Sequence, residues 1–234
     1  MTPLQQHYPH PTRPSNPSLL ELAIYNFELK AKKFHDEKLK VDCNDKGKLA
    51  QMTRDYDHLQ CEKRRIVTHV ALQKGLSDYR NTSENASINT LLAEQHHPTD
   101  ALGKYLTAIG EPKPTKMHEA HHIICGKGKY LQPVMLTARL NLHLHGVGIN
   151  DPINGVWLVN FLKNKEQDWA TPEAPAHRNL HRHNYESWIV GNLSAQNLSK
   201  PLFLTRLKTI KIKIRTGDLP PQVLGPKNEL WKGL

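Results

Sequence analysis

The feature of this 234-residue chain that most restricts its fold is an abrupt change of composition and hydrophobic periodicity between about residues 95 and 115. Before it, apolar residues recur at helical intervals among many charged ones. After it come short apolar runs, turn residues and eight of the 15 histidines, all between His118 and His183. Residues 111–117 contain two prolines and cannot continue a helix. We therefore place the main domain boundary between about residues 95 and 115 and expect two parts of different construction.

The first part begins with residues 1–17, which contain five prolines and little to bury, and which predict an extended arm. Ser18 and Glu21 then have the spacing of a helical capping box. Apolar residues at helical intervals predict a helix that runs from this point to about Lys40.

A second periodic segment predicts another helix, which starts near Met52 and ends near Gly75. The two helices can form a hairpin. Residues 78–98 are rich in Ser, Asn and Thr, which predicts a linker.

The second part mixes helical and strand patterns, so the whole chain is expected to be α+β and mostly helical. The expected elements are a helix from Thr99 to Ile109, a strand over 119–124, a helix or loop over 139–148, a buried strand over 155–159, and helices over 177–193 and 201–216.

Three cysteines (Cys43, Cys61 and Cys125) lie far apart and form no CxxC pair. This favours a reducing compartment and argues against a disulfide framework or a thiolate zinc site. Any metal is therefore expected on imidazole or carboxylate ligands. No apolar run approaches the roughly 18–20 residues of a membrane span, and the first residues lack the pattern of a secretory signal peptide.

The net charge of +10, with histidine neutral, favours a polyanionic partner, because released counterions make phosphate contacts favourable. Residues 200–215 concentrate this charge, since they include six Lys or Arg residues and no acidic one. We interpret this segment as a helix with one face that binds the phosphates of a nucleic acid. Lys208, Lys211 and Arg215 are the residues expected to make these contacts.

Two histidine patterns carry the chemistry of the second part. His121 and His122 are adjacent, and neighbouring side chains on a strand point to opposite faces, so one imidazole can face a metal while the other takes another task. His177 and His181 are spaced i, i+4, which places both on one helical face where they can bind one ion. Together these patterns give a three-ligand site with open positions, as catalytic metal sites have. His183 leaves open an alternative in which His181 alone is the helical ligand with His183 nearby.

The other histidines are interpreted as surface or hydrogen-bonded residues, because a lone histidine is seldom a ligand. They are His7, His10, His35, His58, His69, His96, His97, His118, His143 and His145.

The turn before the second predicted strand reads Asn150-Asp151-Pro152-Ile153-Asn154-Gly155. An Asn at this turn can brace the loop that carries His122. A base needs such a brace, because the tautomer of an imidazole is set by the partner of its other nitrogen.

The order of these motifs resembles the HNH, or ββα-metal, nucleases, and more narrowly their AHH branch, named for Ala-His-His. The resemblance covers roughly residues 100–218 and leaves residues 1–95 outside. This chain departs from the family by having Cys125 where a proline is frequent, and by lacking the small residues usual around the last histidine pair. The matching segments are Glu119-Ala120-His121-His122-Ile123-Ile124, Gly148-Ile149-Asn150-Asp151, Asn154-Gly155-Val156-Trp157-Leu158, and His177-x3-His181 followed by Tyr185.

The sequence patterns predict an extended arm over residues 1–17 and a helical N-terminal segment over 18–95. The resemblance implies that residues 96–234 form an HNH-like nuclease domain that ends in a basic helix. It implies a metal-dependent endonuclease that hydrolyses phosphodiester bonds.

The same resemblance assigns roles to residues. His122 would be the general base and Asn154 would orient it. One divalent ion would be held by His121, His177 and His181, with Mg²⁺ or Zn²⁺ expected and Mn²⁺ or Ni²⁺ as further candidates. A neighbouring phosphate would be clamped by Arg178 or Arg182.

Domains of this family commonly end bacterial toxins, so the resemblance implies an antibacterial, type VI-like effector that acts on DNA. Its expected partners are an acidic immunity protein and a component of the secretion machinery bound through the N-terminal segment. We expect it in the cytoplasm of its producer and, without a signal peptide, in target cells. Three alternatives stay open: a non-catalytic zinc-dependent nucleic-acid-binding module with His183 as the fourth ligand, a ribonuclease with the same site, and a housekeeping or repair nuclease.

Overall fold

The structure is a computed structural model that describes residues 9–42 and 45–234. It divides into two compact units, one up to Ala71 and one from Leu72 to the C-terminus. The described elements are helices apart from one pair of strands, which confirms the expected α+β, mostly helical class. In the described part of the predicted arm, residues 9–17, there is no helix or strand, and residues 1–8 of that arm lie outside the description. No helix among the described residues is long and apolar enough to cross a bilayer.

The first unit is built on α1 (Leu19–Lys38), which begins at the predicted capping box. Ser18 Oγ accepts from the Glu21 N–H at 3.2 Å, and the Glu21 carboxylate accepts from the Ser18 N–H at 2.8 Å. These reciprocal bonds satisfy amide groups that a helix start leaves without partners, so they fix where α1 begins.

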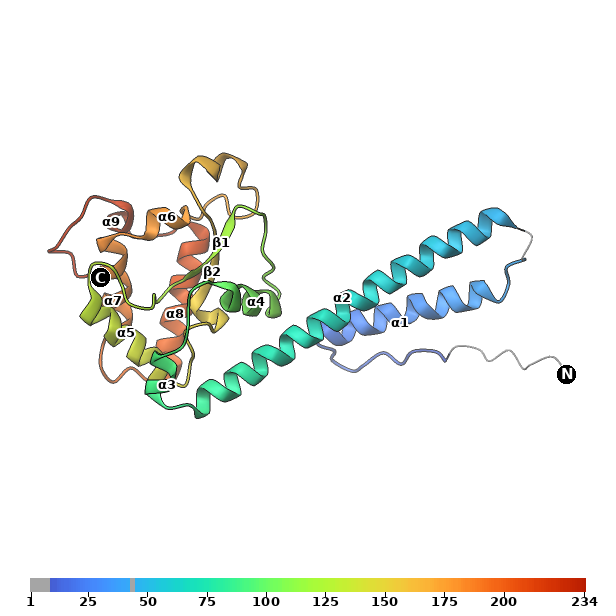
Figure 1. Ribbon diagram of the computed structural model, residues 1–234, viewed down its shortest axis with the longest axis horizontal. Coiled ribbons are helices and arrows are strands. Elements are labelled where there is room, and N and C mark those ends of the chain that lie inside the picture. Colours follow the sequence, from blue (N-terminus) through green and yellow to red (C-terminus); the bar gives the residue numbers. More distant parts are fainter. Residues whose placement is uncertain (1–8, 43–44) are drawn as a thin grey trace. The chain divides into compact units, whose positions relative to one another are not determined.

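The expected helical hairpin is confirmed within this unit, where α1 runs beside the first part of α2 (Lys46–Asn85) (Figure 1). Lys30 Nζ lies 2.6 Å from the Glu62 carboxylate. The Phe34 and Tyr56 rings also lie next to each other.

The predicted helix end near Gly75 and the predicted linker over 78–98 are wrong. α2 continues to Asn85, and α3 (Ile88–Leu92) follows. One glycine inside a helix costs only about 1 kcal/mol relative to alanine, which tertiary contacts readily offset. Such contacts exist here, because Tyr79 and Arg80 bond to the turn before the second strand.

The second unit contains all of the predicted strands. Its further elements are α4 (Asp100–Ala108), β1 (His118–His122), α5 (Gln132–Leu144), the 3-10 helix η1 (Pro152–Asn154), β2 (Gly155–Val159), the 3-10 helix η2 (Leu162–Gln167), α6 (His177–Leu180), α7 (His183–Leu193), α8 (Lys200–Thr216) and α9 (Pro221–Leu224).

One predicted helix of this unit is in fact two. The pattern over 177–193 forms α6 and α7, separated by extended backbone at Arg182 with φ −131° and ψ 157°. The break leaves α6 as a single turn, so the i, i+4 histidine pair survives while the following residues take a different direction.

The two strands pair antiparallel, with Ala120 opposite Trp157 and His121 opposite Val156. α4 lies next to the strand pair (Figure 1). Its Leu102 packs against Ala120 and Trp157 on one face of the pair. Gly155 permits this close packing, because a Cβ there would come within 2.5 Å of the Leu102 side chain. The other face joins the main core, whose members include Ile123, Ile124, Met135, Leu142, Leu158, Trp188, Ile189, Phe203, Leu207 and Ile214.

Asn154 ties the end of β1 to the turn before β2. Its Oδ1 accepts from the Ile124 N–H at 2.8 Å, while its Nδ2 donates to the carbonyls of Ile124 at 3.1 Å and Ile149 at 3.0 Å. The side chain is fully buried and all of its polar atoms have partners. It therefore ties the segment that follows the adjacent histidines of β1 to the turn before β2.

Replacing Asn154 with alanine should lower the free energy of unfolding by about 2–3 kcal/mol, because three backbone groups would be buried without partners. Urea unfolding of the full chain measures this loss. The control is Asn85→Ala, since the exposed Asn85 amide bonds, among the described residues, only to the Asn81 carbonyl of its own helix. Equal losses in the two variants would contradict the role given to Asn154.

Candidate metal centre and active site

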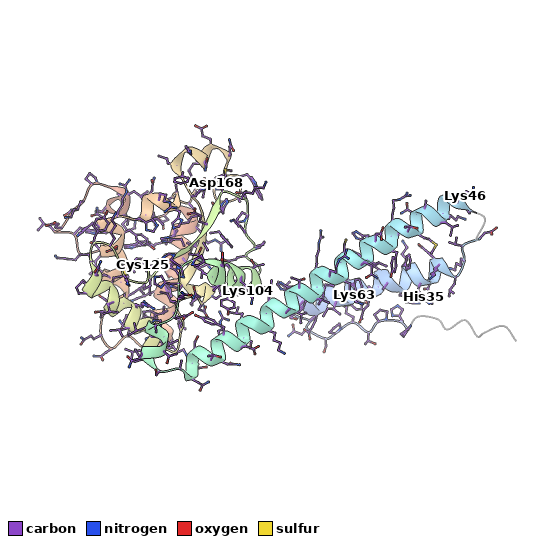
Figure 2. The ribbon with its side chains drawn as sticks, in the orientation of Figure 1. His35, Lys46, Lys63, Lys104, Cys125 and Asp168 are labelled. Atoms are coloured by element: carbon purple, nitrogen blue, oxygen red, sulfur yellow. The ribbon has the colours of Figure 1, made fainter. Side chains whose placement is uncertain are left out.

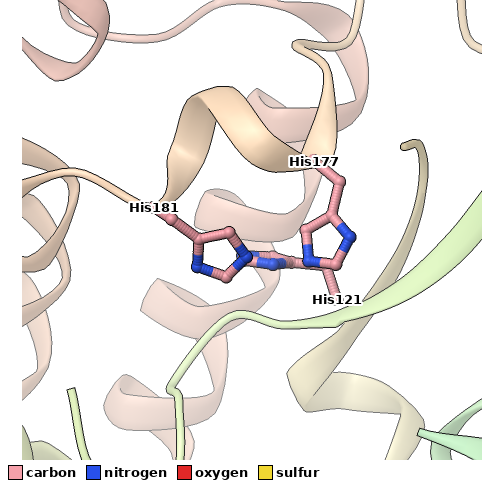
Figure 3. A group of neighbouring side chains, drawn as sticks. All are labelled: His121, His177 and His181. Carbon is pink, nitrogen blue, oxygen red and sulfur yellow. The ribbon is translucent and has the colours of Figure 1, made fainter. Parts of the chain in front are cut away.

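Three imidazoles converge in the second unit. His121 comes from β1, His177 begins α6, and His181 directly follows α6 (Figure 3). Each offers a ring nitrogen, and these nitrogens all lie within 4.8 Å of one another. The structure thus brings together the three ligands predicted from the sequence.

The hydrogen bonds of the two His121 ring nitrogens test whether a metal ion fits at this site. Its Nε2 lies 3.0 Å from the Tyr185 hydroxyl, and that hydroxyl donates its own proton to the Ile123 carbonyl at 2.9 Å. Nε2 must therefore be the donor in this bond, and Nδ1 carries no proton. Nδ1 is buried and has no hydrogen-bond partner among the described residues. Buried polar atoms rarely lack partners, so an unpartnered nitrogen beside two other imidazoles fits a divalent ion.

His177 is oriented by Glu119. The His177 Nδ1 donates to the Glu119 carboxylate at 2.7 Å, which leaves Nε2 as the ligand atom. Sequence reasoning gave Glu119 no role. The signal was nevertheless present, because residues two apart on a strand share a face and Glu119 stands two positions before His121.

Burial keeps the ligand histidines neutral. It lowers the pKa of His177 to about 4, although the bond to Glu119 acts in the opposite direction. Burial also lowers the pKa of His121 well below its usual range and lowers that of His181. At neutral pH all three rings are therefore in the deprotonated form that binds a metal.

His122 lies on the other side of the strand from His121. Its Nε2 is 3.0 Å from Asn150 Oδ1, and burial lowers its pKa to about 4. The rings of His96 and His97 stand near it, with centroids 6.0 and 6.1 Å from its own. Both had been interpreted as ordinary lone histidines, and nothing in the sequence around them indicates this proximity.

The predicted partner of His122 has to be corrected. Asn154 makes no bond to the ring, because both ends of its amide are engaged with backbone at Ile124 and Ile149. It braces the segment that follows His122, while the contact with the imidazole comes from Asn150, four residues earlier in the same turn.

A cleft of about 790 Å³ is lined by five histidines, which are His97, His121, His122, His177 and His181. Arg178 and Lys129 are among its basic wall residues. Cys125, labelled in Figure 2, also lines it, and burial raises the pKa of its thiol to about 11. The thiol is therefore protonated at neutral pH, in agreement with a site built on imidazole.

A buried carboxylate shapes the wall between β1 and α5. Glu186 accepts three successive backbone N–H groups, from Lys129 at 2.5 Å, Tyr130 at 2.9 Å and Leu131 at 2.6 Å. Gly128 takes a positive φ of 73° next to this carboxylate, a conformation that favours glycine. The bonds hold Lys129 at the cleft.

The predicted phosphate-binding face of α8 also needs correction. Lys211 is buried, and its Nζ bonds to the Pro152 carbonyl at 3.0 Å and to Glu111 at 2.9 Å. Arg215 forms an ion pair with the same Glu111 at 3.2 Å. Lys211 is therefore not available to a phosphate. Lys208 is exposed on the same helix.

Arg182 and His183 lie apart from the three histidines. Arg182 donates to the Leu224 carbonyl at 2.6 Å, and His183 lies 3.5 Å from the Ser187 hydroxyl. Both line a separate hollow beside Tyr130. Of the two predicted arginine clamps, only Arg178 stands at the cleft, and His181 rather than His183 joins the cluster.

His118 fits its interpretation as a hydrogen-bonded residue. Its ring is fully buried, with Nδ1 2.8 Å from the Thr115 hydroxyl and Nε2 3.1 Å from that of Thr171. Asp168, labelled in Figure 2, lies 3.4 Å away.

Replacing Glu119 with glutamine should weaken divalent-metal binding by about 10–100-fold, the usual effect of losing a carboxylate behind a histidine ligand. Isothermal titration of the metal-stripped full chain with Zn²⁺ measures this change. Glu173→Gln, at an exposed position, is the matched control and should bind as the parent does. Unchanged affinity in Glu119→Gln would remove Glu119 from the site.

Comparison with known proteins agrees with this geometry. Residues 102–203 match the model of the AHH family, a nuclease family of the HNH/ENDO VII superfamily with a conserved AHH motif. No curated protein and no solved structure was found to match the chain. The matched stretch contains Ala120-His121-His122, His177, His181 and Asn150. Over residues 102–203 the chain is therefore similar to the AHH family of nucleases.

Proposed function

We propose that this chain is a metal-dependent endonuclease in which His122 is the general base beside one divalent ion held by His121, His177 and His181. The observation that carries this proposal is the buried Nδ1 of His121, which has no hydrogen-bond partner among the described residues and lies next to the imidazoles of His177 and His181. The next residue on the strand is His122, whose ring burial keeps neutral. The family match supports the class of reaction.

Phosphodiester hydrolysis needs a water that loses its proton, and charge neutralisation at the phosphate. His122 takes the proton, since burial keeps its ring neutral and Asn150 holds its orientation. Arg178 contacts the phosphate oxygens from the cleft wall. His121, His177 and His181 would hold a divalent ion, which would supply positive charge to neutralise the scissile phosphate and the leaving oxygen.

We propose Mg²⁺ or Zn²⁺ as this ion. Three neutral imidazoles favour zinc, and they also suit Mn²⁺ and Ni²⁺. Magnesium prefers oxygen ligands, which here would come from water and the substrate phosphate. Titration with each ion in turn, followed by a cleavage assay, ranks the four.

DNA is the proposed substrate, and RNA is the alternative that uses the same base. The non-catalytic zinc module is disfavoured because it needs a fourth protein ligand, and its candidate His183 bonds elsewhere. The three-histidine cluster leaves open positions, as catalysis requires.

The biological role we propose is that of an antibacterial effector. It would be made in the cytoplasm of its producer and delivered into target cells through a secretion component that binds the N-terminal segment. An acidic immunity protein would neutralise it, in keeping with the net charge of +10. Support for this role comes from the family resemblance, and a harmless wild-type chain in the bacterial cytoplasm would argue against it.

Purified wild-type chain should cut plasmid DNA when a divalent ion is added, and His122→Ala should be about 100- to 10,000-fold slower because the base is lost. Agarose gels of plasmid and of total RNA, with each ion and with a chelator, measure this difference. His183→Ala is the matched control, since it removes a histidine of the same region outside the cluster.

Each outcome has a distinct meaning. An intact plasmid with every ion defeats the nuclease proposal. Degraded RNA beside intact DNA moves the substrate to RNA. A fully active His122→Ala variant removes His122 as the base, and retardation of DNA without cleavage favours the binding module.

A further inference from the structure

A carboxylate outside the family match lies behind His122. Glu94 precedes the matched residues 102–203 and is half-buried. Its Oε1 accepts from Asn150 Nδ2 at 2.7 Å, and its Oε2 accepts from the Ile149 N–H at 3.2 Å. The Tyr79 hydroxyl donates to the same carboxylate at 2.8 Å. Glu94 is therefore enclosed by three donors, two of which belong to the turn that holds His122.

This contact decides which way the Asn150 amide points. Asn150 Nδ2 lies near two groups that only accept, the Glu94 carboxylate and the Gln95 carbonyl at 2.8 Å. The opposite orientation would set the amide oxygen against both. Asn150 Oδ1 therefore faces His122 and accepts from its Nε2–H at 3.0 Å. Nδ1 is then the nitrogen of His122 that is left to take a proton.

Tyr79 locks the carboxylate and the turn together. Its hydroxyl, while donating to Glu94, accepts from the Asn150 N–H at 3.0 Å. The ring stacks on Tyr105 with centroids 4.6 Å apart. Gly148 makes room for it, because a Cβ at Gly148 would lie 2.0 Å from the hydroxyl oxygen. The end of α2 is thus built into the support of the Asn150 amide.

We propose that Glu94 is a positioning residue of the nuclease: through Asn150 it fixes the Nε2–H tautomer of His122, so that Nδ1 acts as the base. The inference rests on the proposed function of His122. It also assigns a role to Tyr79 and Glu94, which precede the segment matched by the family model.

Glu94→Gln tests this with little change of shape. A carboxylate accepts on both oxygens, whereas a glutamine amide must turn its NH₂ group toward a donor, either Asn150 Nδ2 or the Ile149 N–H. Asn150 Nδ2 then loses its charged acceptor, and only the Gln95 carbonyl still favours the original orientation of the amide. Part of the population therefore turns the Asn150 amide over, and in that part His122 accepts through Nε2 and carries its proton on Nδ1.

The tautomer is read directly by two-bond ¹H–¹⁵N NMR of the full, chelated, ¹⁵N-labelled chain, with the His122 signal identified by its loss in His122→Ala. The wild type should show Nε2–H, and Glu94→Gln should shift toward Nδ1–H. Glu84→Gln should not, because Glu84 is exposed on the same α2 end and pairs only with Lys200 among the contacts of the described residues. An Nδ1–H wild type, or the same tautomer in wild type and Glu94→Gln, overturns the proposal.

Should Glu94→Gln unfold, as a thermal melt would show, Tyr79→Phe carries the test. It leaves the carboxylate in place but removes its hydroxyl donor and the acceptor of the Asn150 N–H. A smaller shift in the same direction supports the proposal, and an unchanged tautomer overturns it.

Kinetics separate this inference from the proposed function. On plasmid DNA, Glu94→Gln should lower kcat by about 10–100-fold and leave KM and zinc affinity within about twofold of the wild type. A fall in zinc affinity and in kcat together would indicate general structural damage and sink the positioning role. A wild type that cuts nothing but shows the Glu94-dependent tautomer would defeat the nuclease function alone.

Discussion

The pairing of β1 with β2 is the constraint on which the rest of the site depends. Two short strands are marginally stable by themselves, so the pair relies on α4 at one face and on the main core at the other. The pairing sends His121 toward α6 and His122 toward Asn150. A slip of one residue would exchange the two histidines between these surroundings. Leu102 packed over Gly155 helps to prevent such a slip.

The site rests on a division between the two nitrogens of each imidazole. In His121, His122 and His177 the protein engages one nitrogen, through Tyr185, Asn150 and Glu119 respectively. Burial disfavours the charged form of all three rings, so the second nitrogen stays without a proton at neutral pH. A neutral ring with one hydrogen-bonded nitrogen can use the other nitrogen either to bind a metal or to accept a proton. The surroundings of each ring decide which of these two roles it takes.

Local spacing was enough to predict much of this. The capping box at Ser18, the strand with the adjacent histidines and the i, i+4 pair at His177 are set by neighbours in sequence, and all appear in the structure. The three ligands followed from the alternation of a strand and the turn of a helix.

What could not be predicted depends on partners distant in sequence. Asn150 and Asn154 stand in one turn, and only the placement of Glu94 and Ile124 decides which of them reaches His122. Lys211 reads as an exposed basic residue until Glu111, 100 positions earlier, is found against it. The polar composition of residues 78–98 likewise gave no sign that α2 continues to Asn85. The contacts that stabilise this end of the helix come from Tyr79 and Arg80, which bond to the distant turn before β2.

The Glu186 carboxylate has a consequence for how a phosphate finds its place. Three successive amides pointing to one spot form a concavity that attracts anions, of the kind that binds free phosphate in many proteins. Here the chain fills that concavity with its own carboxylate. The carboxylate thereby occupies an anion-binding position next to the cleft. In the proposed function, a backbone phosphate would therefore bind at Arg178, Lys129 and the histidines, and not at these amides.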